Sequence, residues 1–137
     1  RFHQDIYISK KDAKAIVHSH STNATALSTH NKTIPSFHYM VALAGGTDIK
    51  CAKYATYGTR ELSKNILKAL MNRSACLIAN HGQIAFGRSL EDAFELAEEV
   101  DNLAKQYIKA LVLGRPKLLT LNQMKKVLSK SKTYKKD

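Results

Sequence analysis

Short apolar segments alternate along this chain with stretches whose apolar residues recur every three or four positions. Strand-like runs lie at residues 13–20, 75–79 and 84–87. Helical periodicity covers residues 24–28, 59–70, 89–113 and a shorter stretch from residue 120, whereas residues 38–44 fit either a helix or a strand. Interleaved strands and helices predict an α/β fold in which helices cover a central sheet.

Capping residues mark where several of these helices begin. Ser89 is followed three residues later by Asp92, and Thr120 is followed by Gln123. Gly114 ends the long helix between them. We expect that helix to bury one apolar stripe, made of Leu90, Ala93, Phe94, Ala97, Val100, Ala104, Tyr107, Ile108 and Leu111.

The 137 residues suit a single domain, and their charge is unevenly distributed. The net charge is +11, but residues 115–137 alone hold eight basic residues and one acidic residue. Because stacking aromatics do not interleave with these lysines, we expect no nucleic-acid partner. No apolar run approaches the roughly 18 residues of a membrane span, so we expect a soluble protein without a membrane partner.

Two further features bear on origin and location. The chain starts at Arg1 without an initiator Met, and we interpret it as a piece of a longer protein. Cys51 and Cys76 have no metal-ligand spacing, which fits free thiols in a reducing compartment. We therefore expect a cytoplasmic protein.

Three histidines are the strongest candidates for chemistry. His18 and His20 are two residues apart on an expected strand, so both imidazoles project from one face. His81 sits in a tight turn between two apolar strands, where side chains are exposed at a sheet edge. Three imidazoles at strand ends suit zinc with one coordination position open. The alternative is that they are ordinary polar residues at strand ends.

Five motifs occur in order along the chain, and together they carry a resemblance. They are His18-Ser19-His20, the segment 34–40 (IPSFHYM), Ala44-Gly45-Gly46, the segment 54–62 (YATYGTREL) and Asn80-His81-Gly82. This set resembles the class II aldolase and adducin-head family, and its aldolase branch more than its epimerase branch. The resemblance implies a three-layer α/β/α domain, of which residues 1–137 form the C-terminal two thirds and residues 131–137 a mobile basic tail.

The resemblance also implies a set of site residues. One zinc ion per subunit would bind His18, His20 and His81. Tyr39 would be a catalytic proton donor, and Tyr57 would line the pocket for the aldehyde.

A second tyrosine and the assembly follow from the same resemblance. Tyr134, in the tail, would close over the site as a second catalytic tyrosine. The family assembles as a homotetramer with sites between subunits, so these aromatics would serve a neighbouring subunit's zinc. Ordinary packing is the alternative for Tyr39 and Tyr57.

The implied activity is a zinc-dependent aldehyde-lyase with a phosphorylated sugar substrate. It would cleave L-fuculose 1-phosphate, or a related ketose 1-phosphate, to dihydroxyacetone phosphate and L-lactaldehyde. The alternatives are an L-ribulose-5-phosphate 4-epimerase, another lyase or dehydratase of the family, and a non-catalytic adducin-like scaffold. The family's catalytic glutamate and phosphate-binding residues precede the position of Arg1, so we expect this chain alone to be inactive unless another carboxylate, such as Asp48, replaces that glutamate.

Overall fold

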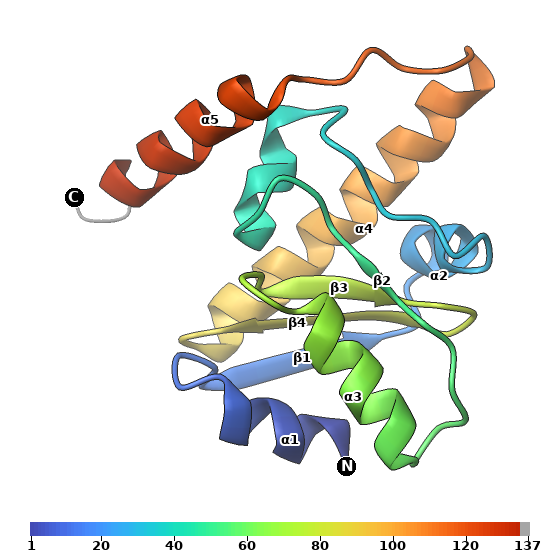
Figure 1. The fold of residues 1–137 in the computed structure, drawn as a ribbon, viewed down its shortest axis with the longest axis vertical. Helices are drawn as coiled ribbons and strands as arrows, with labels where there is room; N and C mark the ends of the chain where they lie inside the picture. The colour runs from blue at the N-terminus through green and yellow to red at the C-terminus, as the bar shows by residue number, and fades with distance from the viewer. Residues whose placement is uncertain (135–137) are drawn as a thin grey trace.

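The computed structural model describes the backbone of residues 1–134. Ten elements follow one another along the chain (Figure 1). They are α1 (Phe2–Ser9), β1 (Ala15–Ser19), α2 (Thr22–Ser28), the 3₁₀ helix η1 (Tyr39–Ala44), β2 (Cys51–Ala52), α3 (Arg60–Ala69), β3 (Ala75–Ile78), β4 (Gly82–Gly87), α4 (Leu90–Val112) and α5 (Leu121–Tyr134).

The four strands form one mixed sheet in the order β1-β4-β3-β2. Strand β4 runs antiparallel to both β1 and β3, whereas β2 is parallel to β3. The carboxyl ends of β1, β2 and β3 therefore lie at the same edge of the sheet. Residues that follow these three strands are brought together there.

Helices cover both faces of the sheet (Figure 1). On one face, α1 and α3 pack against Cys76, Ile78 and Ile84. On the other face, α2, η1, α4 and α5 pack around a cluster that includes Leu77 and Ala85. Successive strand residues point to opposite faces, which explains the continuous burial of β3. The predicted three-layer α/β/α architecture is confirmed.

The predicted caps form as the sequence indicates. The Ser89 hydroxyl accepts a hydrogen bond from the Asp92 amide at 3.1 Å. At the start of α5, Thr120 Oγ1 accepts from the Gln123 amide, and Gln123 Oε1 accepts from the Thr120 amide. Segment 38–44 was undecided from sequence; its residues Tyr39–Ala44 form the 3₁₀ helix η1, and His38 is the N-cap.

Three expectations about helices need correction. Helix α1 has no capping signal in the sequence and was not expected, although Ile6 is fully buried. In α4, Leu90 and Phe94 are exposed, because Leu90 lies in the first turn and Phe94 beside the buried stripe. Leu103, absent from the expected stripe, is buried. The stripe that faces the sheet is rich in alanine, which lets α4 approach closely.

The end of the last helix also differs from the expectation. The sequence predicts only a basic tail beyond residue 131, but α5 continues to Tyr134. The rest of the expected tail, residues 135–137, lies outside the described residues. No helix among the described residues is long and apolar enough to cross a membrane.

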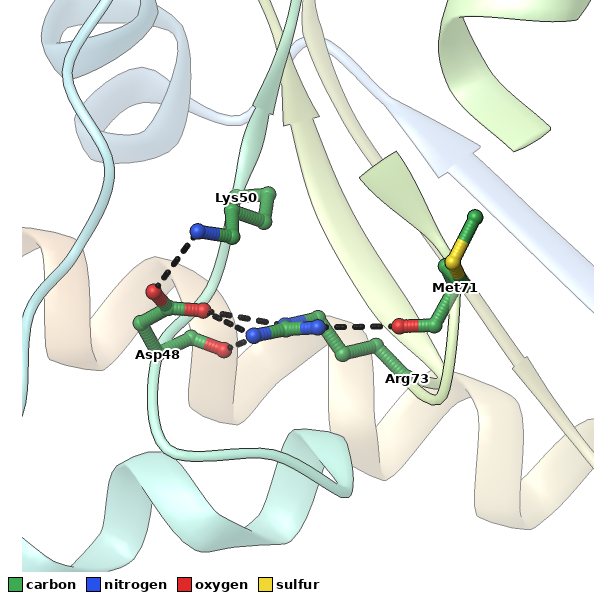
Figure 2. A network of polar contacts seen from close by, with 4 residues as sticks. All are labelled: Asp48, Lys50, Met71 and Arg73. Carbon is green, nitrogen blue, oxygen red and sulfur yellow. Dashed lines mark hydrogen bonds and ion pairs between the residues drawn. The ribbon is translucent and has the colours of Figure 1, made fainter. Parts of the chain in front are cut away.

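Asp48 links the amino ends of β2 and β3 (Figure 2). Its carboxylate pairs with the guanidinium of Arg73 and lies 3.1 Å from Lys50 Nζ. Arg73 also donates to the main-chain oxygens of Asp48 and Met71, at 3.0 and 2.9 Å. This network lies at the edge of the sheet opposite the carboxyl ends of β2 and β3.

Candidate metal centre

The three candidate histidines meet at the carboxyl edge of the sheet. His18 lies near the end of β1, His20 directly follows that strand, and His81 lies between β3 and β4. One ring nitrogen from each histidine can be chosen so that all lie within 4.8 Å of one another. The ring centroids are 4.9–5.1 Å apart, and the ring planes are inclined at 65–80°. The structure brings together all three residues predicted as metal ligands.

A hydrogen bond fixes the tautomer of His18. Its Nδ1 lies 2.8 Å from the main-chain oxygen of Gln83. Because a carbonyl oxygen can only accept, Nδ1 must carry the proton, which leaves the lone pair on Nε2. Metal-binding histidines commonly have this arrangement, with one ring nitrogen donating to a carbonyl and the other free for the metal.

Burial favours the neutral form of two of the histidines. Burial lowers the pKa of His18, and the neighbouring His81 and His20 lower this pKa further. The hydrogen bond to Gln83 acts in the opposite direction but does not outweigh them. Burial also lowers the pKa of His81, again with a contribution from His20. Neutral imidazole is the form that binds metal, so this cluster is prepared for a cation at neutral pH.

The turn that carries His81 is closely packed against the end of β1. Asn80 adopts a left-handed conformation with φ 56°, and its amide donates to Ser28 O at 3.1 Å. At Gly82, a Cβ atom would collide with Ser19 O and lie 3.2 Å from His20 Cδ2. The absence of a side chain at Gly82 therefore allows His81 and His20 to approach.

The histidines open into a pocket of about 530 Å³ with an aromatic rim. Phe2, from α1, and Tyr54 and Tyr57, from the loop after β2, line it. Tyr57 is 82% exposed. Sequence reasoning selected Tyr57 but missed Phe2 and Tyr54; Tyr54 stands in the same motif, three residues before Tyr57. Among the described residues that line this pocket, none carries a carboxylate.

The other predicted residues lie elsewhere or outside the described part. Tyr39 is 54% exposed and begins η1, on the opposite face of the sheet from the residues around Ile16 and His18. It does not line the histidine pocket of its own chain. The side chain of Tyr134 lies outside the described residues. Asp48 is paired with Arg73 at the opposite edge of the sheet, so it is not positioned to replace a catalytic carboxylate here.

The donor set fits zinc. Three neutral imidazoles leave a fourth position open, which is the pattern of catalytic zinc sites. The two thiols are not part of it: partial burial raises the pKa of Cys51 to about 11, and neither Cys51 nor the buried Cys76 belongs to the histidine group.

The family model described as "Class II Aldolase and Adducin N-terminal domain" matches residues 1–108. The chain belongs to this family.

Two curated relatives and one solved structure show how similar other members are. The chain is 49% identical over 134 residues to a 5-methylthioribulose-1-phosphate/5-deoxyribulose-1-phosphate aldolase of Rhodospirillum rubrum, covering 98% of this chain and 61% of the relative. It is 48% identical to the L-fuculose phosphate aldolase of Escherichia coli, covering 98% and 63%. A solved L-fuculose 1-phosphate aldolase superposes with a TM-score of 0.91 at 42% identity, covering 96% of this chain and 61% of that structure. The chain thus spans about three fifths of these relatives.

Proposed function

We propose that the protein containing this chain is a metal-dependent aldehyde-lyase that cleaves a ketose 1-phosphate to dihydroxyacetone phosphate and an aldehyde. The observation that carries this proposal is the convergence of His18, His20 and His81, with Nε2 of His18 left free for a metal. Membership of the class II aldolase and adducin family supports the reaction type.

His18, His20 and His81 would hold one zinc ion per subunit. Zinc bound there would supply Lewis-acid polarisation of substrate oxygen atoms. The protein's own contribution is to bind, orient and exclude water. Phe2, Tyr54 and Tyr57 offer an apolar rim for the tail of the aldehyde product.

The proposed proton-transfer groups come from other parts of an assembly. We assign Tyr39 and Tyr134 to holding and moving a proton at the oxygen that becomes the aldehyde. Because Tyr39 does not line its own chain's pocket, we place its action at a neighbouring subunit's site in a homotetramer, the assembly that the family resemblance implies. Free thiols at Cys51 and Cys76 agree with a cytoplasmic location.

Three candidate substrates of two kinds stand out. L-Fuculose 1-phosphate, which would give L-lactaldehyde, is our first candidate because the solved structure with TM-score 0.91 is an aldolase of that substrate by its title. A 5-deoxy- or 5-methylthioribulose 1-phosphate is the second, because the relative with 49% identity is named for both. All three sugars end in a methyl or methylthio group, which suits an aromatic rim.

The test measures dihydroxyacetone phosphate released from each candidate sugar by the natural protein that contains this chain. We expect zinc-dependent release that is abolished by His81→Ala and retained by His30→Ala, a matched change at an exposed histidine. Epimerised ketose phosphate without cleavage would indicate the epimerase alternative. Folded protein with neither turnover nor bound metal would indicate the adducin-like scaffold. Either result contradicts the proposal.

A further inference from the structure

Gln83 contacts both sides of the His18–His20 segment. Its main-chain oxygen accepts from His18 Nδ1 at 2.8 Å, and its side-chain Nε2 donates to Ser21 Oγ at 3.0 Å. In sequence it stands two residues after His81. Gln83 is thus connected to all three histidines: through a hydrogen bond to one, through the neighbour of the second, and through the chain to the third.

The side chain of Gln83 is itself anchored in α4. It is 1% exposed, and Nε2 also donates to Ala97 O at 2.8 Å. Because Ala97 O can only accept, the amide nitrogen must face it, and this fixes the amide orientation. The main-chain carbonyl that accepts from His18 therefore belongs to a residue whose side-chain amide donates one hydrogen bond to Ser21 and another to Ala97.

Asp101 holds the start of α2, which directly follows this segment. Its carboxylate accepts from the amides of Asn23 and Ala24, at 3.0 and 2.9 Å, and from Asn23 Nδ2 at 2.9 Å. Burial alone would raise the pKa of Asp101, but hydrogen bonds from Ala24, Asn23 and Ser21 hold that pKa below its ordinary value. Asp101 thus caps α2 from α4, directly after the metal-binding segment.

Stability alone does not account for glutamine at this buried position. Gln83 Oε1 is buried and has no hydrogen-bond partner among the described residues. A buried polar atom without a partner lowers stability, because its hydrogen bond to water is lost on folding and not replaced. A leucine would fill much of the same space without that loss, while Ala97 O would keep its helical hydrogen bond.

We propose that Gln83 and Asp101 are positioning residues for the metal: they fasten residues 18–24 to β4 and α4, so that the free nitrogens of the histidines converge. This inference rests on the proposed metal centre. Metal-site residues of this kind typically affect affinity by about 10–100-fold without touching the metal.

The test compares Gln83→Leu and Asp101→Asn with the wild type, each made in the natural protein that contains this chain. Glu98→Gln is the matched control, because it removes the same charge from an exposed position of α4. Zinc affinity is measured by competition with a chromophoric chelator. Thermal unfolding is measured without metal, and nitrogen-15 NMR reports the His18 tautomer.

We expect both variants to bind zinc about tenfold more weakly and the control to bind normally. Metal-free Gln83→Leu should unfold at or above the wild-type temperature, and its His18 should lose the uniform Nδ1-H tautomer. Unchanged affinity and tautomer in both variants would overturn the inference, as would a loss of affinity that only follows a loss of folding.

The outcomes also separate this inference from the proposed function. If the wild type binds no zinc, the proposed metal centre fails, and the tautomer of His18 still decides whether Gln83 positions it. If the wild type binds zinc and both variants bind it equally well, the metal centre stands and the positioning role is wrong.

Discussion

His18 of β1 and Gln83 of the adjacent strand β4 are joined by a hydrogen bond, in which the imidazole Nδ1 donates to the main-chain oxygen of Gln83 at 2.8 Å. This contact determines which nitrogen of His18 is free. Among the described residues, neither His20 nor His81 has a side-chain hydrogen bond of this kind, so His18 is the candidate ligand whose orientation the protein controls most directly.

Replacing any one of His18, His20 and His81 with alanine should remove tight zinc binding. Two imidazoles are too few ligands for a zinc site. We therefore expect zinc affinity to fall by more than about a hundredfold, a larger loss than follows from substituting residues that only support the ligands. Isothermal titration measures this. The exposed His30→Ala variant serves as control, and undiminished binding by any of the three variants would remove that histidine from the ligand set.

Acid should destabilise the metal-free chain. His18 and His81 have pKa values below their ordinary value of 6.5 in the folded state, so the unfolded chain binds more protons as pH falls. The free energy of unfolding should therefore decrease as pH drops below about 6.5 and level off below the lowered pKa values. Urea unfolding between pH 5 and 7.5 checks this, and His18→Ala should flatten the slope.

Gly82→Ala should weaken both folding and metal binding. The new Cβ would collide with Ser19 O and press on His20, and overpacking of this kind is unfavourable by about 1–3 kcal/mol. Urea unfolding and zinc titration measure the two effects. Gly114→Ala is the control, because it places a Cβ at positive φ with nothing within 4 Å; equal effects of both variants would show that backbone strain, not crowding, matters at Gly82.

Arg73→Ala should destabilise the fold by about 1.5–3 kcal/mol and leave zinc affinity unchanged. The substitution removes the hydrogen bonds of Arg73 to the partly buried carboxylate of Asp48, which keeps only Lys50 as a partner, and hydrogen bonds to charged groups have effects of that size. Lys50→Ala removes the other, more exposed partner of Asp48 and should have an effect below about 1 kcal/mol. Altered zinc affinity in Arg73→Ala would mean that the two edges of the sheet are coupled.

Much of this structure can be read from local patterns. The caps at Ser89 and Thr120 and the paired projection of His18 and His20 follow from spacing alone. Helix α1 could not be found in this way, because its stability depends on Ile6 packing under α3 rather than on a capping residue. Gln83 has no sequence signal either, because its proposed role depends on contacts with Ser21, which is 62 positions away in the chain, and Ala97, which is 14 positions away.

The pocket shows the same limit. The motif around Tyr57 indicated a site residue, but the position of Phe2 depends on how α1 packs beside the histidines. Tyr39 lies on the other face of the sheet from its own chain's histidines, and its predicted role at a neighbouring subunit's site stays a prediction. Sequence spacing determines which residues share an element, whereas the packing of elements determines which residues meet.

X-ray absorption spectroscopy of the zinc-loaded chain tests the central claim most directly. The account predicts one zinc per chain with three imidazole nitrogens at about 2.0–2.1 Å. The signal of a fourth ligand, an oxygen atom, should change when ketose phosphate is added. Zinc coordinated by sulfur or mainly by carboxylate oxygens, or a stoichiometry unaffected when His18, His20 and His81 are all replaced by alanine, would contradict it.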